Sequence, residues 1–182
     1  MRRKIGMIVG SLRPGSLNRK VAEHVGELLN EKSDFEFLEI GNLPLYSEVY
    51  DENEPAEYAE FRAKLDEFDG FIFFTPEYNR SIPGVLKNAI DVGSRPWGLS
   101  KWKEKPAAIF SASPGNIGGF GASSHLKQVL SFLNMPFMNQ PEVYLSNIAE
   151  FIDEDGKIEE STSNFLKQAT DAFVEHLELN RR

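Results

Sequence analysis

The stretch "IGMIVGSLRPGSLNR", residues 5–19, places a short apolar run directly before a loop that is rich in hydrogen-bond donors. The apolar run predicts a buried strand over residues 3–9, which ends at Gly10. Apolar residues then recur at helical spacing over residues 17–30, and Ser16 is in place to be the N-cap of this helix. A strand, a polar loop and a helix in this order are typical of the start of an α/β fold.

Strands and helices alternate along the rest of the chain. Residues 35–40 alternate between apolar and acidic, which is typical of a half-exposed edge strand, whereas the unbroken run "GFIFFT", residues 70–75, indicates a central strand. Five strands that alternate with helices predict a parallel sheet covered by helices on both faces. We expect the 182 residues to form one domain, 1–182. The other expected elements are strands over 106–113 and within 137–145, helices over 56–67, 82–92, 122–133 and 162–178, and a turn at Asp155–Gly156.

Composition and charge argue against several classes of protein. The formal net charge of −8 without a basic stripe disfavours binding to nucleic acids. The absence of cysteine excludes disulfides, cysteine-ligated metals and thiol nucleophiles. The apolar run near the N-terminus is too short for a signal peptide or a membrane span, so we expect a cytoplasmic protein that does not attach to membranes. The histidines lack metal-ligand spacing because each falls on a different predicted helix: His24, His125 and His176.

Three loops of unusual composition follow predicted strands, over residues 10–18, 76–81 and 113–121. Ligands of open α/β sheets bind outside the carboxyl ends of the strands, so these loops are expected to lie together. In the first loop, hydroxyl, amide and guanidinium groups meet a helix N-terminus, which suits a compact phosphate dianion. Neither the Walker nor the Rossmann glycine pattern is present, which disfavours a nucleoside triphosphate or a dinucleotide pyrophosphate there. The alternative is that Ser16 only caps the helix and Pro14–Gly15 only turns the chain.

The other two loops each allow two interpretations. Tyr78 and Asn79 either line the edge of a heteroaromatic ring or belong to an ordinary turn with an exposed tyrosine. The four glycines within residues 115–121 either let the backbone approach a ligand closely or make the loop mobile. No G-x-S-x-G pattern or nucleophile–base pair is evident, so an enzyme of this sequence is expected to take its reactive group from a cofactor, such as a flavin that accepts hydride at N5.

Four quoted segments carry a resemblance to a known family. They are "GSLRPGSLN" (10–18), "TPEYNRSIPGVLKNAIDVGSRP" (75–96), "SASPGNIGG" (111–119) and "HLKQVLSFLNM" (125–135). Together they resemble the NADPH-dependent FMN reductase family, which includes quinone, chromate and azo-dye reductases. The resemblance implies a flavodoxin-like three-layer sandwich with the strand order 2-1-3-4-5, FMN as the cofactor, and NADPH or NADH as the co-substrate.

The resemblance also implies a role for each loop. The first loop is expected to hold the FMN phosphate, the second to border the isoalloxazine ring, and the third to lie along the other side of the ring. The nicotinamide and the acceptor are expected to alternate at one open face of the flavin, with a quinone-like, azo, metal-oxyanion or free-flavin acceptor. No side chain is needed as an acid or base in the hydride step, although Glu77 and Tyr78 are candidates to tune the ring or orient the substrate. The residues concerned are Ser11, Arg13, Ser16, Leu17 and Asn18 for the phosphate, Pro76, Glu77, Tyr78 and Asn79 for the ring edge, and Ser111, Ala112, Ser113 and Gly115 for the other side.

Members of this family are usually dimers or tetramers, so a homodimer or homotetramer is expected. Trp97 and Trp102 either join the interface or pack within their own subunit. The stretch "GASS", 121–124, departs from relatives that carry an arginine and an aromatic residue there, as a tetramer contact or substrate gate. The resemblance places four residues at the interface, near the partner's flavin: Lys87, Asn88, Asp91 and Arg95.

Two other functions remain open from the sequence. A flavodoxin-type electron carrier would bind FMN without oxidising NADPH, although Arg13 is unusual for the phosphate loop of a flavodoxin. A non-catalytic flavodoxin-like module would stay colourless when FMN is added.

Overall fold

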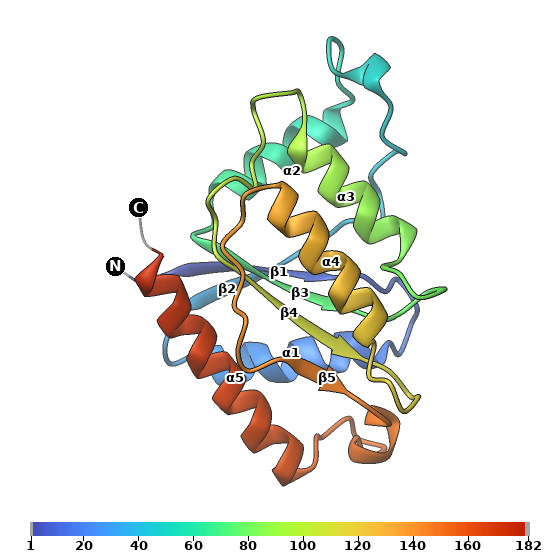
Figure 1. Ribbon diagram of the computed structural model, residues 1–182, viewed down its shortest axis with the longest axis vertical. Coiled ribbons are helices and arrows are strands. Elements are labelled where there is room, and N and C mark those ends of the chain that lie inside the picture. The colour runs from blue at the N-terminus through green and yellow to red at the C-terminus, as the bar shows by residue number, and fades with distance from the viewer. Residues whose placement is uncertain (1, 181–182) are drawn as a thin grey trace.

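A parallel sheet of five strands forms the centre of the molecule, in the order β2-β1-β3-β4-β5 (Figure 1). The computed structural model describes residues 2–180. Each pair of neighbouring strands is parallel, which confirms the fold and the strand order expected from the sequence. The strands are β1 (Lys4–Val9), β2 (Asp34–Leu38), β3 (Gly70–Thr75), β4 (Ala107–Ala112) and β5 (Val143–Leu145).

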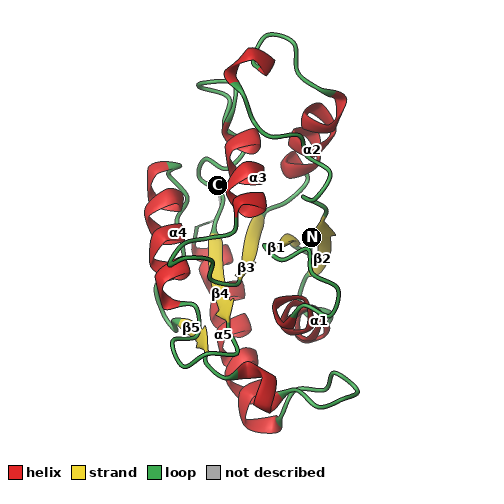
Figure 2. Ribbon diagram, turned by 90° about the vertical axis from the view of Figure 1, so that its right-hand side faces the viewer, coloured by secondary structure: helices red, strands yellow, loops and turns green. Residues whose placement is uncertain are grey.

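Helices cover both faces of the sheet, as Figures 1 and 2 show. Successive side chains of a strand point to opposite faces, so Met7 packs in the core under α1 and α5, whereas Ile8 packs in the core under α2, α3 and α4. The six residues of β3 are all buried, as its unbroken apolar run predicts. The helices are α1 (Leu17–Leu29), α2 (Ala56–Asp66), α3 (Gly84–Ser94), α4 (Phe120–Phe132) and α5 (Glu160–Leu179).

Proline and glycine account for two helix starts that differ from expectation, whereas α5 begins at Glu160, two residues before its expected start, without either residue at its cap. Pro83 is the extended N-cap of α3, so this helix begins at Gly84 rather than at residue 82. Gly119 is the N-cap of α4 with a φ of 81°, and α4 begins at Phe120, two residues before the expected start. The turn expected at 155–156 is confirmed by the isolated antiparallel bridge between Ile152 and Ile158.

The two tryptophans occupy opposite environments. Trp102 is fully buried and its ring contacts those of Phe61 and Phe71. Its indole N–H donates to the carbonyl oxygen of Ile90 in α3 at 2.9 Å. Trp97 is 77% exposed. Of the two interpretations given above, packing within its own subunit is therefore correct for Trp102, and Trp97 remains available at the surface.

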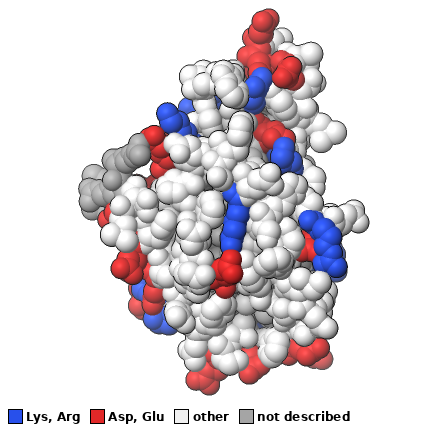
Figure 3. Space-filling view, in the orientation of Figure 1, with Lys and Arg blue, Asp and Glu red and all other residues white. Residues whose placement is uncertain are grey.

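Charged side chains of both signs are spread over the surface, and Figure 3 shows acidic residues gathered at its lower end. This end of the molecule carries the segment between β5 and α5, whose carboxylates include Asp153, Glu154 and Asp155. Within residues 2–180, none of the helices combines the length and the apolar character needed to cross a bilayer.

Candidate functional site

The three loops singled out in the sequence leave the same edge of the sheet. β1, β3 and β4 are neighbours and run in parallel, so their carboxyl ends lie side by side (Figure 1). Two hydrogen bonds join these ends: the Gly10 N–H donates to Phe74 O at 2.8 Å, and Asn18 Nδ2 donates to Ala112 O at 2.9 Å. The topology therefore brings the first, second and third loops together as predicted.

The first loop enters α1 through a side-chain cap. Ser16 is the N-cap, and its buried Oγ accepts a hydrogen bond from the Arg19 N–H at 3.3 Å. Ser16 thus caps the helix, which is compatible with both interpretations given above. The cap does not use the hydroxyl hydrogen, which is free to be donated to a ligand. Gly15 turns the chain just before the cap, with a φ of 70° that a side chain would strain.

Donors without partners are concentrated in this loop. The backbone N–H groups of Ser11, Leu12 and Arg13 have no acceptor within residues 2–180. The exposed Arg13 guanidinium makes no ion pair or hydrogen bond with any described residue. The first turn of α1 contains no acidic residue, so the partial positive charge of the helix N-terminus is not compensated locally. This donor set fits a phosphate dianion.

Asn18 carries a buried polar atom without a partner. Its Nδ2 is used by Ala112 O, whereas its Oδ1 has no hydrogen-bond donor within the described chain. A buried acceptor without a donor is unfavourable, and such atoms in native proteins commonly mark a bound water or ligand. Asn18 therefore offers a ligand an acceptor beside the unpartnered amides.

The second loop contains a tight two-residue turn. Tyr78 and Ser81 exchange two backbone hydrogen bonds, each of 2.9 Å. The residues between them, Asn79 and Arg80, have φ values of 50° and 64°, in the left-handed region. The turn leaves the Tyr78 side chain 53% exposed at the edge of the sheet.

The third loop packs against the protein itself. At Gly118, with φ 61°, a Cβ would lie 2.8 Å from the carbonyl carbon of Tyr144 in β5. At Gly119, with φ 81°, it would lie 2.8 Å from Ser111 Cβ. These two glycines therefore permit a close approach between the loop and its own strands, which neither interpretation from the sequence foresaw.

Two serines at the end of β4 and the start of the third loop form hydrogen bonds within the chain. The buried Ser111 hydroxyl lies 2.7 Å from Gly118 O and 3.1 Å from Val143 O, so it donates its hydrogen to one of these carbonyls. Ser113 Oγ accepts from the Gly115 N–H at 3.0 Å. Ser111 thus supports the loop from beneath rather than presenting its hydroxyl at the surface.

Two contacts that the sequence did not suggest join the second loop to α4. The Ala122 N–H donates to Glu77 Oε2 at 3.1 Å, and Ser81 Oγ forms a hydrogen bond of 2.6 Å with His125 Nδ1. The paired residues are 45 and 44 positions apart, so no local pattern signals either contact.

Asn88, expected at a subunit interface, is instead buried within its own subunit. Its Oδ1 accepts from the Tyr46 N–H at 2.8 Å, and its Nδ2 donates to Pro44 O at 2.9 Å. It therefore fixes the loop that follows β2. Arg95 pairs with Asp51 at 2.6 Å, and thereby joins this same loop to the end of α3.

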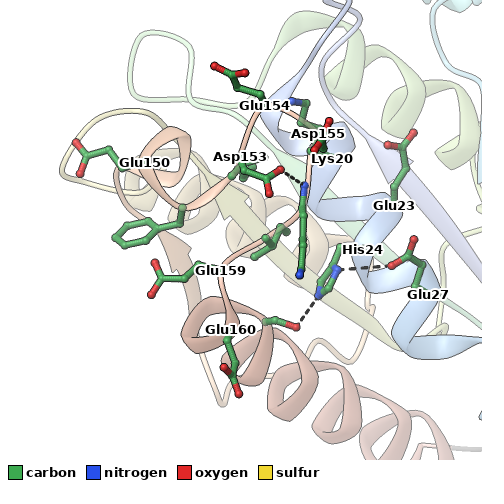
Figure 4. A pocket seen from close by; sticks show the side chains of 16 residues that line it. Lys20, Glu23, His24, Glu27, Glu150, Asp153, Glu154, Asp155, Glu159 and Glu160 are labelled. Atoms are coloured by element: carbon green, nitrogen blue, oxygen red, sulfur yellow. Dashed lines mark hydrogen bonds and ion pairs between the residues drawn. The ribbon is translucent and has the colours of Figure 1, made fainter.

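A large cavity lies elsewhere, between α1 and the segment before α5 (Figure 4). Its volume is about 1170 Å³, and none of the predicted site residues lines it. The carboxylates around it, which include Glu23, Glu27 and Glu159, would repel a phosphate. Cavity size therefore does not locate the site, whereas the unpartnered donors do.

His24 in this cavity makes folding stability depend on pH. Its Nε2 lies 2.8 Å from Ser163 Oγ, and burial lowers the pKa of His24 below 6.5 although Glu27 opposes the shift. The folded state therefore favours the neutral His24 ring. The contribution of this ring to the free energy of unfolding is complete above the pKa of the unfolded state, and it is lost as the pH falls through the pKa of the folded state. We expect the melting temperature to fall more between about pH 7.5 and about pH 5.5 in the wild type than in His24→Gln, measured by circular dichroism. Equal falls would contradict this role.

Comparisons with known proteins agree with this arrangement. The model of the NADPH-dependent FMN reductase family matches residues 3–150. A quinone reductase of Pseudomonas putida (strain KT2440) is 48% identical over 178 residues, 97% of this chain and 96% of that protein. A 2-hydroxy-1,4-benzoquinone reductase of a Burkholderia species is 44% identical over 172 residues, 94% of each chain. The solved structure of a flavoenzyme NAD(P)H:(acceptor) oxidoreductase from Paracoccus denitrificans superposes with a TM-score of 0.93 at 38% identity, covering 99% of this chain and 100% of that one.

Proposed function

The chain belongs to the NADPH-dependent FMN reductase family, and we propose that it oxidises NADPH or NADH and reduces quinones, with FMN bound across the ends of β1, β3 and β4. The main structural support for this proposal is the set of unpartnered hydrogen-bond donors before α1, which fits the phosphate of FMN.

In this proposal the first loop binds the phosphate. The free N–H groups of Ser11, Leu12 and Arg13 and the α1 N-terminus supply neutral donors, and the Arg13 guanidinium supplies a full positive charge. Asn18, expected from the sequence to hold the phosphate, is assigned here to the ribityl chain, because its unpartnered Oδ1 is an acceptor and a ribityl hydroxyl can donate to it. Ser16 adds its hydroxyl hydrogen while its oxygen continues to cap the helix.

In this proposal the second and third loops lie along opposite sides of the flavin ring. Bound FMN supplies the redox chemistry, since it accepts a hydride from the nicotinamide and passes electrons to the acceptor. Pro76–Asn79, which include the exposed Tyr78, border one edge of the ring, and the third loop, which packs on β5, forms the other side. The residues of the chain thus bind and orient the cofactor, and none is required to move a proton in the first step.

The names of the relatives favour a quinone as the acceptor. The Pseudomonas protein is a quinone reductase and the Burkholderia protein reduces 2-hydroxy-1,4-benzoquinone. Both cover nearly the whole chain, so the segment after residue 150, which lies beyond the family match, has a counterpart in each. Azo, metal-oxyanion and free-flavin acceptors, and the cytoplasmic location, stay predictions.

Steady-state kinetics test this function. We expect the purified chain to be yellow, or to become yellow when FMN is added, and to oxidise NADPH or NADH only when both FMN and 1,4-benzoquinone are present. Bound FMN without nicotinamide oxidation would indicate an electron carrier instead. A chain that stays colourless in excess FMN would indicate a non-catalytic module.

We also propose that the chain forms a dimer or tetramer through the end of the molecule that carries the loops after β2 and α3. Leu45 and Val49 on one loop, and Trp97 and Leu99 on the other, are exposed apolar residues. Both loops lie at the upper end of the molecule in Figure 1. The pairing of Arg95 with Asp51 holds the two loops together. Exposed apolar residues that gather in this way are typical of an interaction surface.

A further inference from the structure

The carboxylate of Glu77 is the link between the second loop and α4. Its side chain is 13% exposed, and both oxygens are used. Oε1 pairs with Arg80 Nη1 at 2.8 Å, and Oε2 accepts from the Ala122 N–H in the first turn of α4 at 3.1 Å. Glu77 therefore binds Arg80 inside the turn and also attaches the turn to α4.

Gly121 has no side chain beyond hydrogen, and this leaves room for the carboxylate of Glu77. A Cβ at Gly121 would lie 2.9 Å from Glu77 Oε2 and 3.2 Å from Glu77 Cδ. Real Cβ atoms essentially never approach another atom so closely, so a methyl group here would displace the Glu77 side chain. The "GASS" stretch, which departs from some relatives, begins with this glycine.

The turn that Glu77 holds has an unfavourable backbone. Asn79 and Arg80 are both in the left-handed region, which asparagine tolerates but which is unfavourable for arginine, so the conformation of Arg80 needs support from its surroundings. The attachment to α4 has a second point, because Ser81 Oγ bonds to His125 Nδ1 one helical turn beyond Ala122. The two points flank the turn, one on each side.

We propose that Glu77 is a positioning residue, which with the space left by Gly121 fixes the Tyr78–Ser81 turn on α4 in the conformation that borders the flavin ring. This inference rests on the proposed function, because only a bound flavin gives the turn a ligand to border. The ion pair between Glu77 and Arg80 cannot by itself fix the turn, because Arg80 is 69% exposed and exposed ion pairs contribute little to stability. The hydrogen bond from the Ala122 N–H to Glu77 Oε2, at the N-terminus of α4, therefore contributes most of the attachment.

Hydrogen exchange of the full-length chain without FMN tests the attachment directly. The Tyr78 and Ser81 amides bond within the turn, so their exchange reports how often it opens. We expect Glu77→Ala to speed their exchange about tenfold, the effect of losing a hydrogen bond to a charged group. Glu77→Gln keeps an acceptor for the Ala122 N–H but loses the charge, so its exchange should fall between those of the wild type and Glu77→Ala.

Gly121→Ala provides the decisive comparison. In the wild-type background it should speed exchange, though by less than Glu77→Ala, because the methyl group pushes the flexible end of the Glu77 side chain away from the Ala122 N–H. In the Glu77→Ala background it should add nothing, since the space is then free. Gly84→Ala is the matched control: it also changes the first turn of a helix, and nothing lies within 4 Å of its Cβ.

Flavin measurements on the same variants test the purpose of the attachment. We expect FMN to bind about tenfold more weakly to Glu77→Ala, with a shifted midpoint potential, a smaller change of both properties in Gly121→Ala, and partial recovery of both in Glu77→Gln. Unchanged exchange in Glu77→Ala would overturn the proposal. Faster exchange with unchanged affinity and potential would also overturn it, because the turn would then not serve the flavin. If the wild type binds no FMN, the proposed function fails, while the exchange result still decides whether Glu77 holds the turn.

Discussion

Replacing Trp102 by alanine is expected to lower the free energy of unfolding by about 3–5 kcal/mol, the range for removing a large aromatic side chain from a core. The ring is fully buried against Phe61, Phe71 and Phe73, and its loss leaves a cavity between α2, α3 and the sheet. The carbonyl of Ile90 also loses its indole donor. Chemical denaturation followed by circular dichroism measures this change.

Trp97→Ala is the matched control for Trp102→Ala. The Trp97 side chain is 77% exposed, so its removal should change the stability of the subunit by less than about 0.5 kcal/mol. It should instead weaken self-association, which analytical ultracentrifugation measures. Equal destabilisation by the two substitutions would contradict the distinction drawn between these tryptophans.

The second large effect concerns Arg13. Arg13→Ala is expected to weaken FMN binding by about 1–3 kcal/mol, because it removes a charge-assisted hydrogen bond to the phosphate. The guanidinium makes no contact with other described residues, so folding stability without FMN should not change. Fluorescence titration of FMN, together with thermal melts of the protein without FMN, separates the two properties.

Two further variants sharpen this test. Arg13→Lys keeps the charge but loses the planar fork, so its affinity for FMN should fall between those of the wild type and Arg13→Ala. Lys20→Ala removes a positive charge from α1 on the side of the acidic cavity, and should leave FMN affinity close to that of the wild type. If Lys20→Ala weakens binding as much as Arg13→Ala, the effect is one of overall charge and Arg13 does not contact the phosphate.

The fold was predictable because its signals are local. The unbroken apolar run at 70–75 identifies β3, and the apolar spacing after Ser16 identifies α1. Boundaries were less certain where a single backbone conformation decides them. The start of α4 depends on the left-handed conformation of Gly119, which apolar periodicity does not report.

The site was predictable only in part, for a similar reason. The rule that ligands bind at the carboxyl ends of parallel strands brought the three loops together. The bonds that shape the loops are long-range: Glu77 with α4, and Ser111 with the carbonyls of Gly118 and Val143. No pattern within a single loop predicts these partners. The same applies to Asn88, whose burial depends on a loop more than forty residues earlier.

The edge that carries the site is shaped mostly by main-chain atoms. Free amides, left-handed turns and carbonyls tied by hydrogen bonds define the first and second loops, and close backbone contact defines the third. Side chains that point outward from such a frame, Tyr78 among them, can be exchanged without dismantling it. An architecture of this kind is readily adapted in evolution: the redox partner can diversify through surface substitutions while the prosthetic group stays in place.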